Sequence, residues 1–502
     1  MSKQNKGKVI LVTFFMTMFI FLCLPFHGAS YDLEKKVRVF ILENGMRILM
    51  LERNMSPTVS LYIRHRVGAV DEETGKTGTA HLLEHMLFKG TRTIGTKNFT
   101  EEEKWLKKII ETGHLLDLEK MKGKQADTHH LERLNKQLDA LNREHKSWMV
   151  ENEIDRIYTE NGAVDLNAST GKDLTTYHVS LPKNKIELWA RIESDRMTNP
   201  VFREFYSERN VIMEERKQRV ESDPGGKLFE QFLATAFIAH PYRHPILGWP
   251  FDIGFLSIDD TERFFKRYHA PNNTVIAVVG DIDPDQTFHV INKYFGSISR
   301  QNLPKSCIIK EPPQAEERRI DVVFDARPQL IIGYNKPNMP DPDDYVFDVI
   351  ESLLSRGRTS RLYRTLVSDK KIAETIETVN GIPGSRYANL FVIFGRPRHP
   401  HTNAELETSI YSEIEKLKTG FVSEKELEKI KNHLKADFIR TLDSNAGLAE
   451  SLSFFEALVG DYRYMTNHIH MIEKITPADI SRVAQKYLIR ENRTVARLVQ
   501  KQ

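Results

Sequence analysis

The stretch that organises this chain is Gly78-Thr79-Ala80-His81-Leu82-Leu83-Glu84-His85-Met86-Leu87-Phe88-Lys89-Gly90-Thr91. Its two histidines, His81 and His85, are four residues apart, so on an α-helix they share one face and can bind one zinc ion. Glu84 lies three residues after His81, where its carboxylate can take a proton from water at the same metal. The order His-x-x-Glu-His reverses the commoner zinc motif His-Glu-x-x-His.

An ordinary amphipathic helix with polar residues on its outer face is the alternative interpretation of this stretch. Its flanks argue against that, because Leu82, Leu83, Met86 and Leu87 would place both histidines and the carboxylate in largely buried surroundings. Unpaired buried charge is costly, and a bound metal removes that cost. The stretch therefore predicts a zinc-binding helix, with Glu84 as the catalytic base.

A zinc site with two histidines needs a third ligand, and a carboxylate from a second helix can supply it. Residues 207–216 have helical composition, and Glu208 and Glu215 lie seven residues apart, on nearly the same face. By spacing alone, Glu208, Glu214 and Glu215 are equal candidates.

The first thirty residues have the composition of an export signal. Lys3, Lys6 and Lys8 precede an apolar run from Val9 to Phe26, and small residues follow at 28–30. We expect a cleaved signal peptide over 1–30; an uncleaved membrane anchor is the alternative. Cleavage leaves Cys307 as the only cysteine, which cannot form an internal disulfide.

The composition excludes a nucleic-acid partner. The 502 residues carry 72 basic and 69 acidic side chains, a net charge of +3, with no basic stripe interleaved with aromatic residues. The length is ample for two or more hydrophobic cores.

Two features of the first half bear on its architecture. The apolar runs 37–42 and 46–51 flank Glu43-Asn44-Gly45, which predicts a β-hairpin, and 59–67 continues the sheet. Residues 101–157 are densely charged, and their leucines recur at helical spacing at 131, 134, 138 and 141. We expect a helical hairpin that stands off the main body as a structural insertion; a role in gating or partner contact is the alternative.

These motifs together resemble the pitrilysin-like zinc metallopeptidases, family M16, which include the mitochondrial processing peptidase. The resemblance covers nearly all of the chain after the signal segment, and it rests on the blocks 43–46, 81–91, 166–170, 208–215, 240–245 and 272–281. It implies that Glu215 is the third zinc ligand and that Glu208 steadies a ligand histidine. It also implies that Asn167 and Ala168, on an open strand edge, contact the substrate backbone.

The resemblance also implies a fold. We expect an α+β protein of two similar halves, each a mostly antiparallel sheet covered by helices, which form a clamshell around a cavity. The expected domains are 31–300, with the insertion 101–157, and 319–502, which has no metal site; 301–318 links them. A repeat supports the duplication, since the pattern of 256–279 recurs in 475–498 at a constant offset of 219 residues.

Active relatives often carry an Arg and a Tyr, seven residues apart, in the second half. Val367 and Glu374 occupy those positions here, which suggests a partner chain of the same family that supplies the pair. The alternative is that this chain holds the substrate with a residue of its own, which would be Arg361, Tyr363 or Arg364.

The expected function is that of an exported, periplasmic zinc endopeptidase with one zinc ion per chain. It would cleave peptides or unfolded polypeptides, and it would form a homodimer or heterodimer with another chain of the family. A non-catalytic subunit or a peptide-binding chaperone is the alternative. We expect no nucleic-acid contact, and no membrane contact beyond the signal segment.

Overall fold

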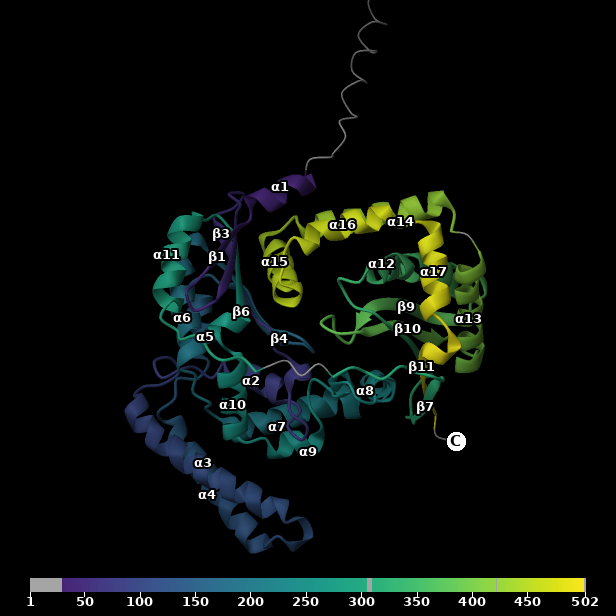
Figure 1. Cartoon of the computed structure of the whole chain (residues 1–502). Coiled ribbons are helices and arrows are strands. Elements are labelled where there is room, and N and C mark those ends of the chain that lie inside the picture. The colour runs from purple at the N-terminus through teal and green to yellow at the C-terminus, as the bar shows by residue number, and fades with distance from the viewer. Residues whose placement is uncertain (1–28, 305–308, 421, 501–502) are drawn as a thin grey trace, which may run out of the picture.

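The computed structural model describes residues 29–304, 309–420 and 422–500 (Figure 1). All but the last two residues of the expected signal peptide, and Cys307, therefore lie outside the described residues. Within those residues, no helix combines the length and the apolar character that crossing a bilayer requires. The first described element is α1 (Ala29–Lys36).

The strands form two sheets, one from each half of the chain. The first has the order β1-β2-β6-β3-β5-β4, with β1 (Arg38–Ile41), β2 (Arg47–Glu52), β3 (Thr58–His65), β4 (Val164–Thr170), β5 (Thr175–Pro182) and β6 (Thr274–Gly280). The second has the order β7-β11-β8-β10-β9, with β7 (Arg318–Val323), β8 (Gln329–Lys336), β9 (Ala373–Ile382), β10 (Asn389–Pro397) and β11 (Arg493–Val499).

Both sheets are mostly antiparallel, as expected. Among the described strands, the parallel neighbours are β2–β6 in the first sheet and β7–β11 in the second. The predicted hairpin is confirmed as the antiparallel pair β1–β2. Its turn is held by Asn44, whose side chain accepts from Met46 N at 3.1 Å and donates to Phe295 O at 2.8 Å.

The sequence repeat corresponds to a repeated structural unit. Helix α10 (Ile258–Tyr268) leads into β6, and helix α17 (Pro477–Tyr487) leads into β11. Each helix begins with the same reciprocal cap, formed by Ser257 with Asp260 and by Thr476 with Asp479. The two halves are therefore built on one plan.

Each half also lends a helix to the sheet of the other half. Helix α8 (Pro224–Ala236) packs Leu228, Phe232 and Leu233 against the second sheet. Helix α15 (Asn445–Val459) packs Leu448 and Leu452 against the first sheet. This exchange buries apolar side chains of both halves in shared cores and so joins the two halves (Figure 1).

The remaining helices cover the outer faces and ends of the sheets. The first sheet packs against α5 (Glu153–Glu160), α6 (Ile186–Thr198) and α11 (Pro284–Phe295). The second packs into one core with α12 (Pro342–Ser355), α13 (Asn403–Thr419), α14 (Glu424–Thr441), α16 (Tyr464–Lys474) and α17. The predicted two-halved α+β fold is confirmed.

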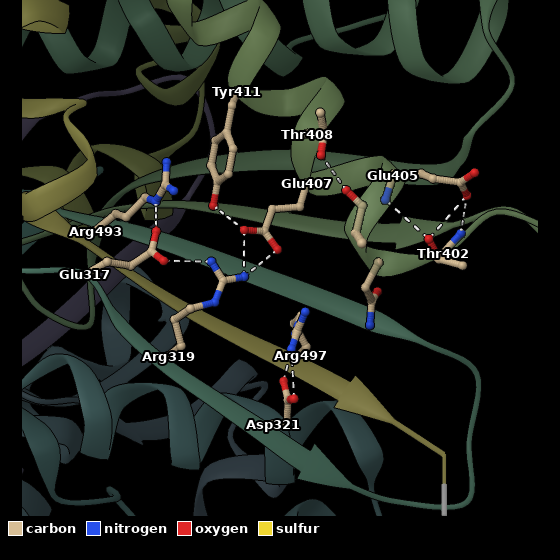
Figure 2. A network of polar contacts seen from close by, with 12 residues as sticks. Glu317, Arg319, Asp321, Thr402, Glu405, Glu407, Thr408, Tyr411, Arg493 and Arg497 are labelled. Carbon is tan, nitrogen blue, oxygen red and sulfur yellow. Dashed lines mark hydrogen bonds and ion pairs between the residues drawn. The ribbon is translucent and has the colours of Figure 1, made fainter. Parts of the chain in front are cut away.

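Charged side chains fix α13 to the second sheet (Figure 2). Arg319 of β7 donates to both carboxylate oxygens of Glu407 at 2.7 Å, and the Tyr411 hydroxyl donates to the same carboxylate at 2.7 Å. Glu317 pairs with both Arg319 and Arg493 of β11. The network ties one helix to two neighbouring strands.

The expected helical hairpin is formed by α3 (Phe99–Met121) and α4 (Thr128–Lys146), which extend away from both sheets (Figure 1). Leu134 and Leu138 from the predicted apolar stripe are buried, and Leu131 and Leu141 are partly buried against the same core. The end of the segment behaves differently, because α5 packs into the core of the first sheet through Ile154.

Candidate metal centre

The helix that carries the histidines, α2 (Thr79–Met86), begins at a constrained glycine. Gly78 has φ +90°, and a Cβ placed there would lie 2.8 Å from Leu247 O. The buried Glu72 carboxylate accepts from Gly78 N at 3.0 Å and Ala80 N at 2.8 Å, and so satisfies free amides of the first turn. The start of α2, and with it the position of His81, is held by the close approach of Leu247 O and by the Glu72 carboxylate.

His81, His85 and Glu215 converge on one point. Glu215 lies on α7 (Phe205–Arg216), and its Oε2 is 3.8 Å from the Nε2 atoms of both histidines. The three ligand atoms all lie within 4.8 Å of one another. Two donors that are each about 2.1 Å from a zinc ion can be at most about 4.2 Å apart, so this spacing fits a single ion with little adjustment.

The protonation of His81 also fits a metal ligand. Burial, with smaller contributions from the charges of His85 and Arg219, lowers the pKa of His81 to about 3. Its ring is therefore neutral at neutral pH, with a lone pair free to bind a metal. The chemistry and the spacing of the donor set both match zinc.

Glu208 lies where it can orient His85. Its Oε2 is 3.2 Å from His85 Nδ1, while the ring's other nitrogen faces Glu215. Lys89 pairs with Glu208 and, at 3.1 Å, with Glu204. Burial acts to raise the pKa of Glu208, but the hydrogen bonds from His85 and Lys89 outweigh it and lower that pKa. Glu208 thus remains a charged acceptor that fixes the ring of His85.

Glu84 faces the same space from the next position on α2. The hydroxyl of Thr170, at the end of β4, donates to Glu84 Oε2 at 2.5 Å. Burial raises the pKa of Glu84, and the Thr170 hydrogen bond opposes that rise only in part. A carboxyl group with a raised pKa is better matched to accepting and returning a proton near neutral pH.

A cavity of about 730 Å³ lies between the halves, and its lining includes the side chains of His81, Glu84, His85 and Glu215. One wall is strand β4, including Asn167 and Ala168, and β4 is an edge strand because it pairs only with β5. The other walls include apolar side chains of η4 (Lys217–Glu221), α8 and the loop before α9 (Pro250–Phe255), and Ile382 and Pro383 of the second half.

The wall from the second half is held by the loop after β9. Arg386 donates to the two carboxylate oxygens of Asp71 at 2.9 and 3.1 Å. Asp173, beside β4, accepts from Ser385 N at 2.6 Å and from the Tyr242 hydroxyl at 2.7 Å. These contacts fix the relative position of the two halves at the edge of the cavity.

Sequence reasoning did not identify three residues that support the site. They are Thr170, which binds Glu84; Glu72, which caps α2; and Arg219, whose Nη1 lies 2.9 Å from Glu215 Oε1. Thr170 is the last residue of the block 166–170, on which the family resemblance partly rests, so this block could have pointed to Thr170 as a site residue. No spacing rule points to Glu72. Arg219 follows Glu215 by four residues, a common ion-pair spacing on helices.

The second half contributes neither an arginine nor a tyrosine to the cavity, as far as the described residues go. Val367 packs against the core of the second half, and Glu374 lies 3.7 Å from Arg327. The alternatives also point elsewhere, since Arg361 pairs with Glu426 and Arg364 faces Asp369. Tyr363, the third alternative, packs partly buried against the same core.

Comparison with protein families places two matches side by side on the chain. Residues 47–106 and 109–249 match the family described as insulinase (peptidase family M16). Residues 256–434 match the peptidase M16 inactive domain. The first match contains the proposed metal ligands, and the second contains most of the second sheet.

Curated relatives match over most of their length. The chain is 28% identical to the zinc protease PqqE of Helicobacter pylori over 492 residues, which cover 96% of this chain and 94% of that protein. It is 22% identical to a probable mitochondrial-processing peptidase subunit beta of Arabidopsis thaliana, over 90% of this chain and 76% of the relative.

Solved structures share the fold. A protease from Helicobacter pylori superposes with a TM-score of 0.77 at 24% identity, covering 92% of this chain and 99% of that one. The periplasmic protease PqqL from Escherichia coli superposes with a TM-score of 0.68 at 16% identity, covering 93% of this chain and 48% of that one.

Proposed function

The chain belongs to peptidase family M16, and on that premise we propose that it is an exported zinc endopeptidase that cleaves peptides or unfolded polypeptides. One observation carries the proposal: a zinc-compatible donor set and the half-buried Glu84 carboxylate face the same cavity beside an open strand edge. His81, His85 and Glu215 would hold the metal, and Glu84 would be the catalytic residue.

When bound, zinc would act as a Lewis acid on the scissile carbonyl and would lower the pKa of water at the site toward neutrality. Glu84 accepts the proton of the attacking water and then delivers it to the leaving amine. The Thr170 hydroxyl, 2.5 Å away, keeps the Glu84 carboxylate directed into the cavity. Glu208 holds the ring of His85 with one nitrogen toward Glu215.

The substrate is an extended chain that adds to the edge of β4. Antiparallel pairing with β4 uses main-chain hydrogen bonds, which require little of the substrate's sequence. Asn167 and Ala168 would contact the substrate backbone on the same side of the cavity as Glu84. A cavity of about 730 Å³ admits a few residues of extended chain and excludes folded domains.

Export and a partner chain complete the proposal. The basic and apolar composition of residues 1–30 supports export, and a structural neighbour, PqqL, is described as periplasmic. The lack of an Arg or Tyr from the second half among the described residues of the cavity supports a second chain of this family, identical or not, that completes the substrate site.

The Glu84→Gln variant tests the proposal. It keeps the size of the side chain and the metal ligands but removes the base, so it should retain zinc and lose cleavage of a mixed peptide library. Glu214→Gln, at an exposed site beside the third ligand, is the matched control and should retain both. Full cleavage by Glu84→Gln would remove Glu84 from the mechanism.

The rival proposal is a non-catalytic subunit or a peptide-binding chaperone. It is favoured by the inactive-domain match, but that match covers residues 256–434, which contain no His-x-x-Glu-His motif. A chelator decides between the two, because it should abolish cleavage by an enzyme and leave peptide binding by a chaperone intact.

A further inference from the structure

Arg219 borders the candidate metal centre but has no role in the chemistry proposed so far. It lies on η4, a short π-helix that continues α7 beyond Glu215, and such turns are frequent at functional sites. Its side chain lines the cavity and is 69% exposed, and its Nη1 lies 2.9 Å from Glu215 Oε1. Gly226 of α8 packs against the carbonyl oxygen of Arg219, where a Cβ would lie only 1.9 Å away. The backbone that carries the guanidinium is therefore closely held.

The guanidinium of Arg219 has hydrogen-bond donors to spare. Arginine carries five N–H donors, and Glu215 occupies one side of the fork. The contact uses Oε1 of Glu215, whereas Oε2 is the oxygen that faces both histidines, so it does not compete for the metal-facing atom. In the part of the chain that the structure describes, the guanidinium has no second hydrogen-bond or ion-pair partner. Its remaining N–H groups are available to a ligand in the cavity.

Arg219 also supplies the accessible positive charge of the cavity. Of the described residues that line it, the other lysine or arginine is Lys172, which is only 3% exposed and donates its Nζ to His244 O. Much of the remaining wall is apolar and includes Phe229 and Leu233. A charged donor beside apolar walls is stronger than one in water, because little solvent competes for its hydrogen bonds.

The charge of Arg219 reaches the rest of the site as well. Burial has the largest effect on the pKa of His81 and on that of Glu84, and the positive charge of Arg219 acts to lower both. The guanidinium thus lies within electrostatic range of the catalytic carboxylate and of two metal ligands. A scissile peptide bond placed between them would lie beside it.

We propose that Arg219 is a second catalytic residue, which donates hydrogen bonds to the carbonyl oxygen of the scissile peptide bond. The inference rests on the proposed function. The water oxygen bonds to the carbonyl carbon, one water proton passes to Glu84, and the C=O electron pair moves onto the carbonyl oxygen, where Arg219 stabilises the negative charge. The C=O bond then re-forms, the C–N bond breaks, and the leaving amine takes the proton from Glu84.

The kinetic test removes the guanidinium and then returns it. Arg219→Ala should lower kcat about 100-fold on a library peptide that the wild type cleaves, and should change KM less than about threefold, because the hydrogen bond strengthens as charge develops. Guanidinium chloride, at concentrations too low to unfold the chain, should then raise kcat of the variant about tenfold. A side chain that only supports the fold would not be replaced by a free ion.

The matched control is Arg263→Ala. The Arg263 side chain is 70% exposed and pairs with Asp260 of its own helix, as Arg219 pairs with Glu215, but it lies on α10 and does not line the cavity. Arg263→Ala should keep the wild-type kcat, with and without guanidinium.

Zinc content separates a role in catalysis from support of Glu215. Arg219→Ala should retain one zinc ion per chain. Arg219→Lys keeps a positive charge beside Glu215 but lacks the planar fork, so it should also retain zinc and should recover only part of kcat.

A phosphinic analogue of the cleaved peptide gives a measurement that does not depend on turnover, because its tetrahedral anionic group resembles the hydrated carbonyl. In calorimetric titrations, Arg219→Ala should weaken binding of this analogue about 100-fold. Binding of the parent peptide, measured in the Glu84→Gln background, should weaken less than about threefold.

Three results would overturn the inference: an unchanged kcat in Arg219→Ala, a loss of zinc that matches the loss of rate, or equal weakening of the analogue and the parent peptide. Failure of the proposed function looks different. In that case the zinc-loaded wild type would cleave no peptide, which would exclude both proposals together.

Discussion

Replacing Glu102 by Gln should weaken the attachment of the α3–α4 hairpin to the body. Glu102 is fully buried on α3 and accepts from Arg203 Nε at 2.7 Å and from His145 Nε2 of α4 at 2.8 Å. Arg203 also donates to the carbonyl oxygens of Lys89 and Thr91, in the loop that follows α2. This one carboxylate therefore joins both hairpin helices to the segment next to the candidate metal centre.

The magnitude follows from the pKa of Glu102. Burial acts to raise it, but the hydrogen bonds from His145 and Arg203 outweigh burial and lower the pKa from 4.5 to about 2. At about 1.4 kcal/mol per pH unit, this shift corresponds to about 3 kcal/mol of stability at neutral pH. Because the folded pKa is the lower one, that stability is present above pH 4.5 and is lost as the pH falls toward 2. Glu102→Gln also leaves Arg203 buried without its counter-charge, so the loss should be about 3–5 kcal/mol at pH 7.

The assay is urea unfolding followed by circular dichroism, with hydrogen exchange resolved over residues 99–146. Glu102→Gln should lower the unfolding free energy at pH 7 and speed exchange in the hairpin first, and its deficit should shrink below pH 4.5. Glu103→Gln, beside it on the surface with only a 3.3 Å pair to Lys107, should change stability by less than about 0.5 kcal/mol. Equal stability of Glu102→Gln and Glu103→Gln would refute the reasoning.

Two further predictions concern the metal centre. Glu208→Gln removes the charged acceptor of His85 Nδ1 and should weaken zinc binding about 10–100-fold in a competition titration with a chelating dye, whereas Glu214→Gln should bind as tightly as wild type. An unchanged zinc affinity in Glu208→Gln would show that Glu208 does not orient His85 for metal binding. Thr170→Val removes the hydroxyl that fixes Glu84 and should lower kcat about tenfold at unchanged zinc content. If Thr170→Ser restores the rate, the hydroxyl is responsible; equal losses in both variants would assign the effect to packing.

The local part of the site could be predicted from the sequence. The spacing of His81, Glu84 and His85 sets their geometry on any helix, and in α2 the side chains of all three line one cavity. The same holds for the β1–β2 turn and for the buried Leu134 and Leu138 of the hairpin. In each case, the spacing or type of residues close in sequence is enough to predict the local structure.

Contacts between distant segments could not be predicted in this way. Spacing left Glu208, Glu214 and Glu215 equivalent, and the choice depends on how α7 packs against α2 through residues such as Leu83 and Ile212. In the structure the Glu214 side chain is 65% exposed and faces away. Strand β3 joins the sheet of β1 and β2, as expected, but it does not pair with β2. Strand β6, more than 200 residues later in the chain, lies between β2 and β3.

The most direct test of the account is the zinc content of the purified chain after dialysis against a weak chelator. We expect one zinc ion per chain in the wild type and in Glu214→Gln, and almost none in Glu215→Gln. Zinc missing from the wild type, or held equally by Glu215→Gln, would contradict the claim that His81, His85 and Glu215 bind a catalytic metal.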